Sequence, residues 1–147
     1  MTIMDAINRI DNIKPNGYSQ AEKMMWLSVL DTMIHTKIID THESHEEVDI
    51  DFDGYNEGTS LTTELLVPAP YDEVYIYWLE SKIDYWNGET NKYNNSIEMY
   101  NTAFSEFERY YNRTHMPKGK KFKYFEQPKT PELQVVSRVA KVSIEEE

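Results

Sequence analysis

The sequence contains no cysteine and only five glycines among its 147 residues. The lack of cysteine excludes disulfides and thiolate metal sites, and it is typical of proteins kept in a reducing cytoplasm. No run of eighteen apolar residues occurs, so we expect no transmembrane helix. The first eleven residues are amphipathic and include Asp5 and Asp11, unlike the basic start and apolar core of a signal peptide. We therefore expect a folded domain that is made and kept inside a cell.

Positive charge is also scarce, with 15 Lys and Arg residues against 26 Asp and Glu residues. Residues 1–114 hold 8 basic and 21 acidic side chains, a balance of −13, whereas residues 115–141 hold 7 basic and 2 acidic, a balance of +5. The acidic body would repel a phosphate backbone, so we do not expect it to bind DNA. The basic tail suits either nucleic acid or an acidic protein surface. We favour the protein surface because the chain ends in Glu145–Glu147.

Apolar periodicity predicts a mainly helical protein, a small bundle of about four helices. The first helix is short and ends before Pro15–Gly17; its apolar positions are Ile3, Ala6, Ile7 and Ile10. The second is expected over residues 19–40, where Ser19 and Glu22 have the spacing of a capping box. Its apolar stripe, widened beyond one face by Trp26, Leu27 and Leu30, consists of Met25, Val29, Met33, Ile34 and Ile38.

The third and fourth helices are expected from Pro70 to Gly88 and over residues 90–113. Because the link between them is so short, they should form an antiparallel hairpin. One side of the third helix would consist of Tyr71, Val74, Tyr75, Trp78, Leu79, Lys82 and Trp86. The fourth has a heptad seam, with apolar residues at steps of 4, 3, 4, 3 and 4. The seam residues are Tyr93, Ile97, Tyr100, Phe104, Phe107 and Tyr111.

Residues 41–70 break the helical period, and we expect a long acidic loop or hairpin there. Seven acids crowd positions 40–53, too densely for a buried element. Within them, Val48, Ile50 and Phe52 alternate with aspartates as in a short edge strand. Connections of this length in compact domains are usually functional or bound to a partner.

We divide the chain into a helical domain over residues 1–117 and an extended C-terminal arm over residues 118–147. Residues 133–144 are β-branched and partly alternating, which predicts a strand at the end of the arm. A lone strand needs a partner edge for its backbone amides, and addition to a neighbouring chain would supply one. The arm residues that we expect to bind a partner are Leu133, Val135, Val136, Val139, Val142 and Ile144 in the strand and Lys120, Lys121 and Lys123 before it.

Aromatic residues make up 13% of the chain, more than one helical hairpin can bury. Most aromatics at helical spacing belong to a core, and we expect this for Trp78, Trp86, Tyr100, Phe104 and Phe107. The surplus consists of Tyr77, Tyr85, Tyr110 and whichever of Trp26 and Tyr75 points outward. Because such amphipathic side chains are enriched at protein interfaces, we expect the surplus to lie in an oligomer interface.

No residue set in the sequence is typical of an active site, so we expect no enzyme activity and no cofactor. Residues 49–54 begin like an EF-hand calcium loop, but its twelfth position is Ser60 rather than glutamate. His42 and His45 are three residues apart, whereas the zinc-protease pattern needs two histidines four apart on one helix. Residues 118–121 lack the upstream glycine and the strand of a phosphate-binding loop.

Several segments resemble small virion proteins of long-tailed phages and prophages of Gram-positive bacteria. The segments are ELLVPAPYD at 64–72, Trp78–Glu80, Ile83–Tyr85, Asn87–Glu89, Tyr93–Ser96 and Tyr111–Pro117, with Ala6–Ile10 and Lys14–Asn16 near the start. The resemblance covers residues 1–119. Size and helical plan are similar to those of head–tail connectors, the adaptors that form a ring under the portal.

The resemblance implies a structural virion protein of the phage neck, assembled in the host cytoplasm as a ring, commonly a dodecamer. Its partners would be other copies of itself, the portal protein and the next neck or stopper protein. Genomic DNA would pass through the channel without specific binding, and no membrane is involved. Two other classes stay open: an acidic phage or prophage protein that regulates a host factor, and a metal-dependent enzyme that uses the acidic loop 40–53.

Overall fold

The computed structural model describes residues 1–43 and 51–119. Its helices are α1 (Ile3–Ile13), α2 (Gln20–Lys37), the 3-10 turn η1 (Ile39–Thr41), α3 (Glu73–Trp86) and α4 (Thr90–Thr114). The predicted mainly helical class with four α-helices is therefore confirmed. Within the described residues there is no strand, and only isolated bridges join Thr2 to Glu64 and His42 to Pro117. The strand and the lysines predicted in the arm lie outside the described residues.

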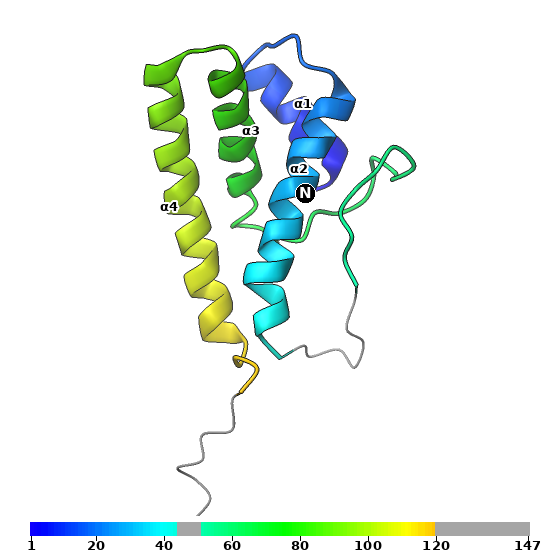
Figure 1. Cartoon of the computed structure of the whole chain (residues 1–147), viewed down its shortest axis with the longest axis vertical. Helices are drawn as coiled ribbons and strands as arrows, with labels where there is room; N and C mark the ends of the chain where they lie inside the picture. The colour runs from blue at the N-terminus through cyan, green and yellow to red at the C-terminus, as the bar shows by residue number, and fades with distance from the viewer. Residues whose placement is uncertain (44–50, 120–147) are drawn as a thin grey trace, which may run out of the picture.

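α3 is the central helix of the bundle (Figure 1). It packs against α4 on one side and against α1 and α2 on the other. The predicted antiparallel hairpin of α3 and α4 is confirmed. Its turn contains Gly88 at φ 72°, a left-handed conformation that favours glycine, which explains why the Asn-Gly pair ends α3.

The hairpin is held together by its aromatic seam. The ring of Tyr100 in α4 lies 5.0 Å from that of Trp78 in α3, and the ring of Phe107 lies 6.4 Å from that of Tyr71. Burial raises the pKa of Tyr100 to about 12. Tyr100 and Phe107 are buried, and the other four seam residues are half-buried. The heptad spacing therefore identified the side of α4 that faces α3.

Helices α1 and α2 begin at side-chain caps. Ser19 accepts the backbone N–H of Glu22 (3.1 Å), which is one of the two bonds of the predicted capping box; the return bond from the Glu22 side chain is not formed. Thr2 and Asp5 form a complete capping box that the sequence analysis missed. The Thr2 backbone N–H lowers the pKa of Asp5 below its ordinary value. α2 ends at Lys37, short of the expected Asp40, because the Thr41 hydroxyl instead donates to the Ile38 carbonyl (2.8 Å).

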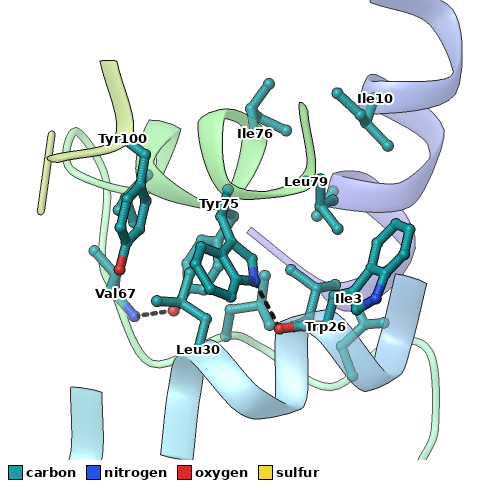
Figure 2. Packing of buried hydrophobic residues seen from close by; sticks show 14 of the residues in the cluster. Ile3, Ile10, Trp26, Leu30, Val67, Tyr75, Ile76, Leu79 and Tyr100 are labelled. Atoms are coloured by element: carbon teal, nitrogen blue, oxygen red, sulfur yellow. Dashed lines mark hydrogen bonds between the residues drawn. The ribbon is translucent and has the colours of Figure 1, made fainter. Parts of the chain in front are cut away.

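The core lies between α1, α2 and α3, and Figure 2 shows part of it around Ile10, Leu30 and Leu79. The face of α2 that it buries differs from the predicted stripe. Met25 and Val29 are 51% and 52% exposed, so the prediction was wrong at these two positions. The apolar residues of α2 that are buried are Met24, Trp26, Leu27, Leu30, Ile34 and Ile38. Apolar residues lie on both sides of this helix, and only the packing of α1 and α3 decides which side is covered.

The long connection between α2 and α3 is fastened to the bundle by one buried carboxylate. Asp31 in α2 is fully buried and accepts three hydrogen bonds: from the Tyr75 hydroxyl (2.5 Å), from the Tyr55 hydroxyl and from the Leu66 backbone N–H (3.2 Å). The Tyr75 hydroxyl in turn accepts the backbone N–H of Val67 (2.9 Å), as Figure 2 shows. One carboxylate thus joins α2, α3 and two points of the connection.

The surroundings of this cluster shift the pKa values of its ionisable groups. Burial raises the pKa of Asp31 above its ordinary value, and its three hydrogen-bond donors oppose that shift without cancelling it. Burial and the nearby carboxylate also raise the pKa values of Tyr55 and Tyr75. Both hydroxyls therefore keep their protons and continue to donate to Asp31 well above neutral pH.

From Asp51 onward, the connection lies along α2 and its described residues form no strand. The edge strand predicted over residues 48–52 is absent at Asp51 and Phe52, and its other positions lie outside the described residues. The Phe52 ring instead packs against the rings of Tyr55 (5.3 Å) and His35 (5.7 Å). Gly54 has φ 86° and lies against Ser28, whose hydroxyl oxygen accepts the Tyr55 N–H (2.8 Å). Close approach to α2 therefore explains the glycine of the EF-hand-like pattern.

A second buried carboxylate joins the other end of the bundle. Asp84 in α3 is fully buried, pairs with the Lys14 ammonium after α1, and accepts the Ser96 hydroxyl of α4 (2.9 Å). Lys14 also lies 3.6 Å from Glu80. The C-terminal end of α1, α3 and the start of α4 are therefore fixed relative to one another.

We predict that Asp31→Asn lowers the free energy of unfolding by about 1–3 kcal/mol, because the new amide N–H₂ faces the Leu66 N–H and leaves it unpaired. The raised pKa means that the native state binds the Asp31 proton more tightly than the unfolded chain does. The contribution of this proton binding to the free energy of unfolding is therefore full below the ordinary pKa of 3.8. It declines as pH rises through the raised pKa of Asp31.

Urea unfolding of both proteins between pH 3 and pH 8 measures this prediction. The stability gap between wild type and Asp31→Asn should be widest in acid and should narrow toward neutral pH. A gap that widens as pH rises would contradict a raised pKa at Asp31. Asp53→Asn, an exposed substitution of the same kind, is the matched control and should leave only a small gap.

Candidate interaction surface

Within the described residues, the two aromatic side chains that are more than half exposed lie together at one end of the bundle. At this end the loop between α1 and α2 meets the turn between α3 and α4 (Figure 1). Trp86, the last residue of α3, is 61% exposed, and Tyr85 is 58% exposed. We define this aromatic end by its five aromatic side chains: Tyr18, Trp26, Tyr85, Trp86 and Tyr93. Large aromatics that are more than half exposed are the informative exceptions on a protein surface.

A cleft of about 330 Å³ opens beside Trp86, and we refer to it as the Trp86 cleft. Its lining consists of Gly17, Tyr18, Ser19, Glu22, Trp26 and Trp86. The Tyr18 ring stands edge-on to the Trp26 ring at 5.3 Å. Its hydroxyl donates to the side-chain oxygen of Asn87 (2.7 Å), which joins the α1–α2 loop to the α3–α4 turn. The walls of the cleft thus come from two connections that are fixed to each other.

On the other side of Trp86 lies a tyrosine pair. The Tyr85 ring packs edge-on against Trp86 at 5.3 Å and lies 5.5 Å from the ring of Tyr93 in α4. Nearby, the Lys82 ammonium sits 4.4 Å above the Trp78 ring, and burial lowers the pKa of Lys82. The aromatic end is therefore continuous from the α1–α2 loop to the first turn of α4.

The exposed area continues along α2. Met25 and Val29 follow Glu22 at steps of three and four residues, so the three side chains share one face of the helix. Both apolar residues are about half exposed. Of the predicted apolar stripe, Met25 and Val29 are thus available for contact with another molecule, whereas Ile34 and Ile38 are buried.

The predictions for the aromatic residues have mixed outcomes. Trp78, Tyr100 and Phe107 are buried as expected, and Phe104 is half-buried. The core position predicted for Trp86 is wrong. As the last residue of α3 it has neighbours on few sides, and its ring lies between Tyr85 and the cleft.

The predicted surplus tyrosines do not gather at one place. Tyr85 belongs to the aromatic end, and Tyr77 is half-buried two turns earlier in α3. Tyr110 stacks on Tyr71 at 4.6 Å, far along α4. Trp26 and Tyr75 are 5% and 0% exposed, so neither points outward. Their partner-binding role stays a prediction.

Periodicity gave no signal for the Trp86 cleft. Tyr18 lies in a loop, and Glu22 was interpreted only as part of a helix cap. The one usable signal was the position of Trp86 next to the Asn-Gly stop, because the last turn of a helix has fewer neighbours than its middle. The face of α2 that carries Met25 and Val29 cannot be told from a core stripe by spacing alone.

The described residues offer little to a metal ion. Within residues 1–43 and 51–119, no three His, Asp or Glu side chains gather in a suitable arrangement. His42 is buried, donates from Nδ1 to the Ile38 carbonyl (2.6 Å) and packs edge-on against Tyr111 at 5.0 Å. His45 and Asp49 lie outside the described residues. The described helices also include none with both the length and the apolarity to cross a bilayer.

The chain was compared with protein-family models, with curated proteins and with solved structures, and none of the three comparisons found a match.

We predict that Trp86→Ala changes the free energy of unfolding of the monomer by less than about 0.5 kcal/mol, because the side chain is mostly exposed. Trp78→Ala is the comparison. Its ring is buried and its Nε1–H donates to the Trp26 carbonyl (2.8 Å), so the loss should be about 3–5 kcal/mol. Urea unfolding at low protein concentration measures both. Equal losses would place Trp86 in the core after all.

Proposed function

We propose that this protein is a structural virion protein, a head–tail connector that forms a ring on the portal and joins the capsid to the tail. The observation that carries the proposal is the aromatic end, where Tyr85 and Trp86 are more than half exposed, together with Met25 and Val29, which are half exposed on α2. Large apolar side chains left exposed in this way are typical of sites that bind other proteins. A protein whose function is assembly needs such a surface.

The family-like segments support the choice of a phage neck because they build the fold. Within residues 64–72, Leu65 and Val67 are buried, and the N–H groups of Leu66 and Val67 bind the Asp31–Tyr75 cluster. Asn87–Glu89 forms the hairpin turn. Part of the resemblance therefore lies in residues that build this helical plan.

Charge is consistent with a channel for DNA. Residues 1–114 carry a balance of −13, and an acidic wall lets a polyanion slide without binding it. The basic segment with Lys120, Lys121 and Lys123 and the strand predicted over residues 133–144 would then bind the portal or a neighbouring subunit. Both are sequence-based proposals for residues outside the described part of the chain.

Native mass measurement of the full chain, alone and mixed with portal protein, tests the proposal. We expect several copies to assemble on each portal, because a ring of identical subunits repeats one contact around an axis. A chain that remains a monomer or dimer and never binds portal would contradict the connector and favour the regulator of a host factor. A mass or stability change on addition of a chelator would favour the metal-dependent enzyme.

Deletion of residues 120–147 tests the role proposed for the arm. We expect portal binding to weaken at least tenfold, while the circular dichroism of the helices stays unchanged. A matched variant keeps the arm's length and all its basic residues, Arg138 and Lys141 included, but replaces the apolar residues of 133–144 with Gly and Ser, so that strand and charge are tested separately. Portal binding that survives the deletion would overturn the role of the arm.

A further inference from the structure

We infer that the Trp86 cleft binds a lysine side chain from the basic segment 120–123 of a second copy of this chain. The inference rests on the proposed function, since it names one of the contacts that would repeat around the ring. It assigns a ligand class, an alkylammonium group, to a cleft that the sequence did not reveal.

The chemistry of the cleft is that of a cation site. It is lined by the aromatic residues Tyr18, Trp26 and Trp86, and its one acidic residue is the half-buried Glu22. Aromatic faces attract an ammonium group through their negative quadrupole, and tryptophan does so best. The apolar stem of a lysine suits the same rings. A carboxylate next to them adds a charge-assisted hydrogen bond.

Glu22 has no cation of its own. Its backbone N–H donates to Ser19, but within the described residues its carboxylate has neither an ion-pair nor a hydrogen-bond partner. The nearby lysines are already paired: Lys23 lies 2.5 Å from Asp11, and Lys14 is bound to Asp84. The carboxylate in the cleft is therefore the acid that an incoming ammonium group would meet.

The cleft is formed before any ligand arrives. The Tyr18 hydroxyl is fixed by Asn87, and the main chain of Trp26 is fixed because its carbonyl accepts the Trp78 indole N–H (2.8 Å), a bond drawn in Figure 2. Ser19 caps the first turn of α2, which places Glu22. A rigid site loses little conformational entropy on binding.

The chain's own sequence supplies the cation. Lys120, Lys121 and Lys123 follow directly after the described residues, in the stretch 115–141 with its balance of +5, whereas residues 1–114 carry −13. This is the charge complementarity expected of a contact between two copies.

The cation must come from a second copy because of the geometry. The Lys118 backbone N–H donates to the Thr41 carbonyl (2.9 Å), so the basic segment starts beyond the C-terminal end of α2. The Trp86 cleft lies at the other end of α2, whose 18 residues span about 27 Å. Lys123 is four residues beyond Gly119, a reach of about 14 Å for its backbone. A copy therefore cannot fill its own cleft with these lysines.

Such a contact joins opposite ends of two molecules and is heterologous. Repeated through identical copies, it closes into a ring if the rotation permits and otherwise extends into a filament. The proposed contact thus has the symmetry that a ring requires.

A charge-swap experiment on the full chain tests the inference, with association measured by sedimentation velocity. Glu22→Lys alone and the triple variant K120E/K121E/K123E alone should each weaken self-association at least tenfold, because each places like charges together. The two combined should restore self-association.

Glu22→Gln removes the charge without adding one and should weaken self-association less than Glu22→Lys does. Glu98→Lys on the exposed side of α4 is the matched control and should change little.

Circular dichroism of every variant verifies that the helices are intact, and Glu22→Gln keeps the test valid if Glu22→Lys fails to fold. Wild-type assembly that is unaffected by Glu22→Gln and Glu22→Lys would overturn the inference while leaving the connector proposal in place. So would a loss of association that occurs with Glu22→Lys but not with the triple variant, because the cation would then come from elsewhere. A wild type that is monomeric at all concentrations overturns the inference as well, and its portal binding then decides the connector proposal separately.

Discussion

The rest of the structure depends on the carboxylate of Asp31. It is fully buried, and its three donors come from Tyr75 in α3 and from Tyr55 and Leu66 in the long connection. A buried carboxylate is tolerated only where its hydrogen-bonding capacity is used, so the connection can cross the bundle in few ways. These hydrogen bonds fix α3 against α2. The turn to α4 and the aromatic end follow directly from the C-terminal end of α3. The candidate interface is therefore positioned by a polar cluster at some distance from it.

Helix content and pairing were predictable because they depend on local signals. The heptad seam on α4 and the Asn87–Gly88 stop specify the hairpin, and Ser19 specifies the start of α2. The Asp31 cluster was not predictable, since its side-chain partners lie 24 and 44 residues away and follow no period. The buried face of α2 was misassigned because apolar residues occur on both sides of the helix. Trp86 was wrongly assigned to the core because the spacing of apolar residues does not show where a helix ends.

The residues that close the core differ from the apolar residues that are left exposed on the surface. The core between α1, α2 and α3 is closed by Leu27, Leu30 and Leu79, and both buried carboxylates have partners, so the fold does not require Trp86, Met25 or Val29. These three are left with apolar area in water, which a second protein surface would remove. In the proposed ring, the Trp86 cleft would accept the basic segment of the next copy, while the acidic body would keep DNA from binding. In that proposal, the exposed aromatic end has its explanation in assembly.

The central claim is that the aromatic end is covered when the protein assembles. Hydroxyl-radical footprinting with mass spectrometry measures side-chain accessibility directly, on the free chain and on the chain assembled with portal. The account predicts that oxidation of Trp86, Tyr85 and Met25 falls strongly on assembly, while oxidation of Met99, which is exposed on α4, stays near its free value. Unchanged oxidation of Trp86 in an assembled particle would contradict the account.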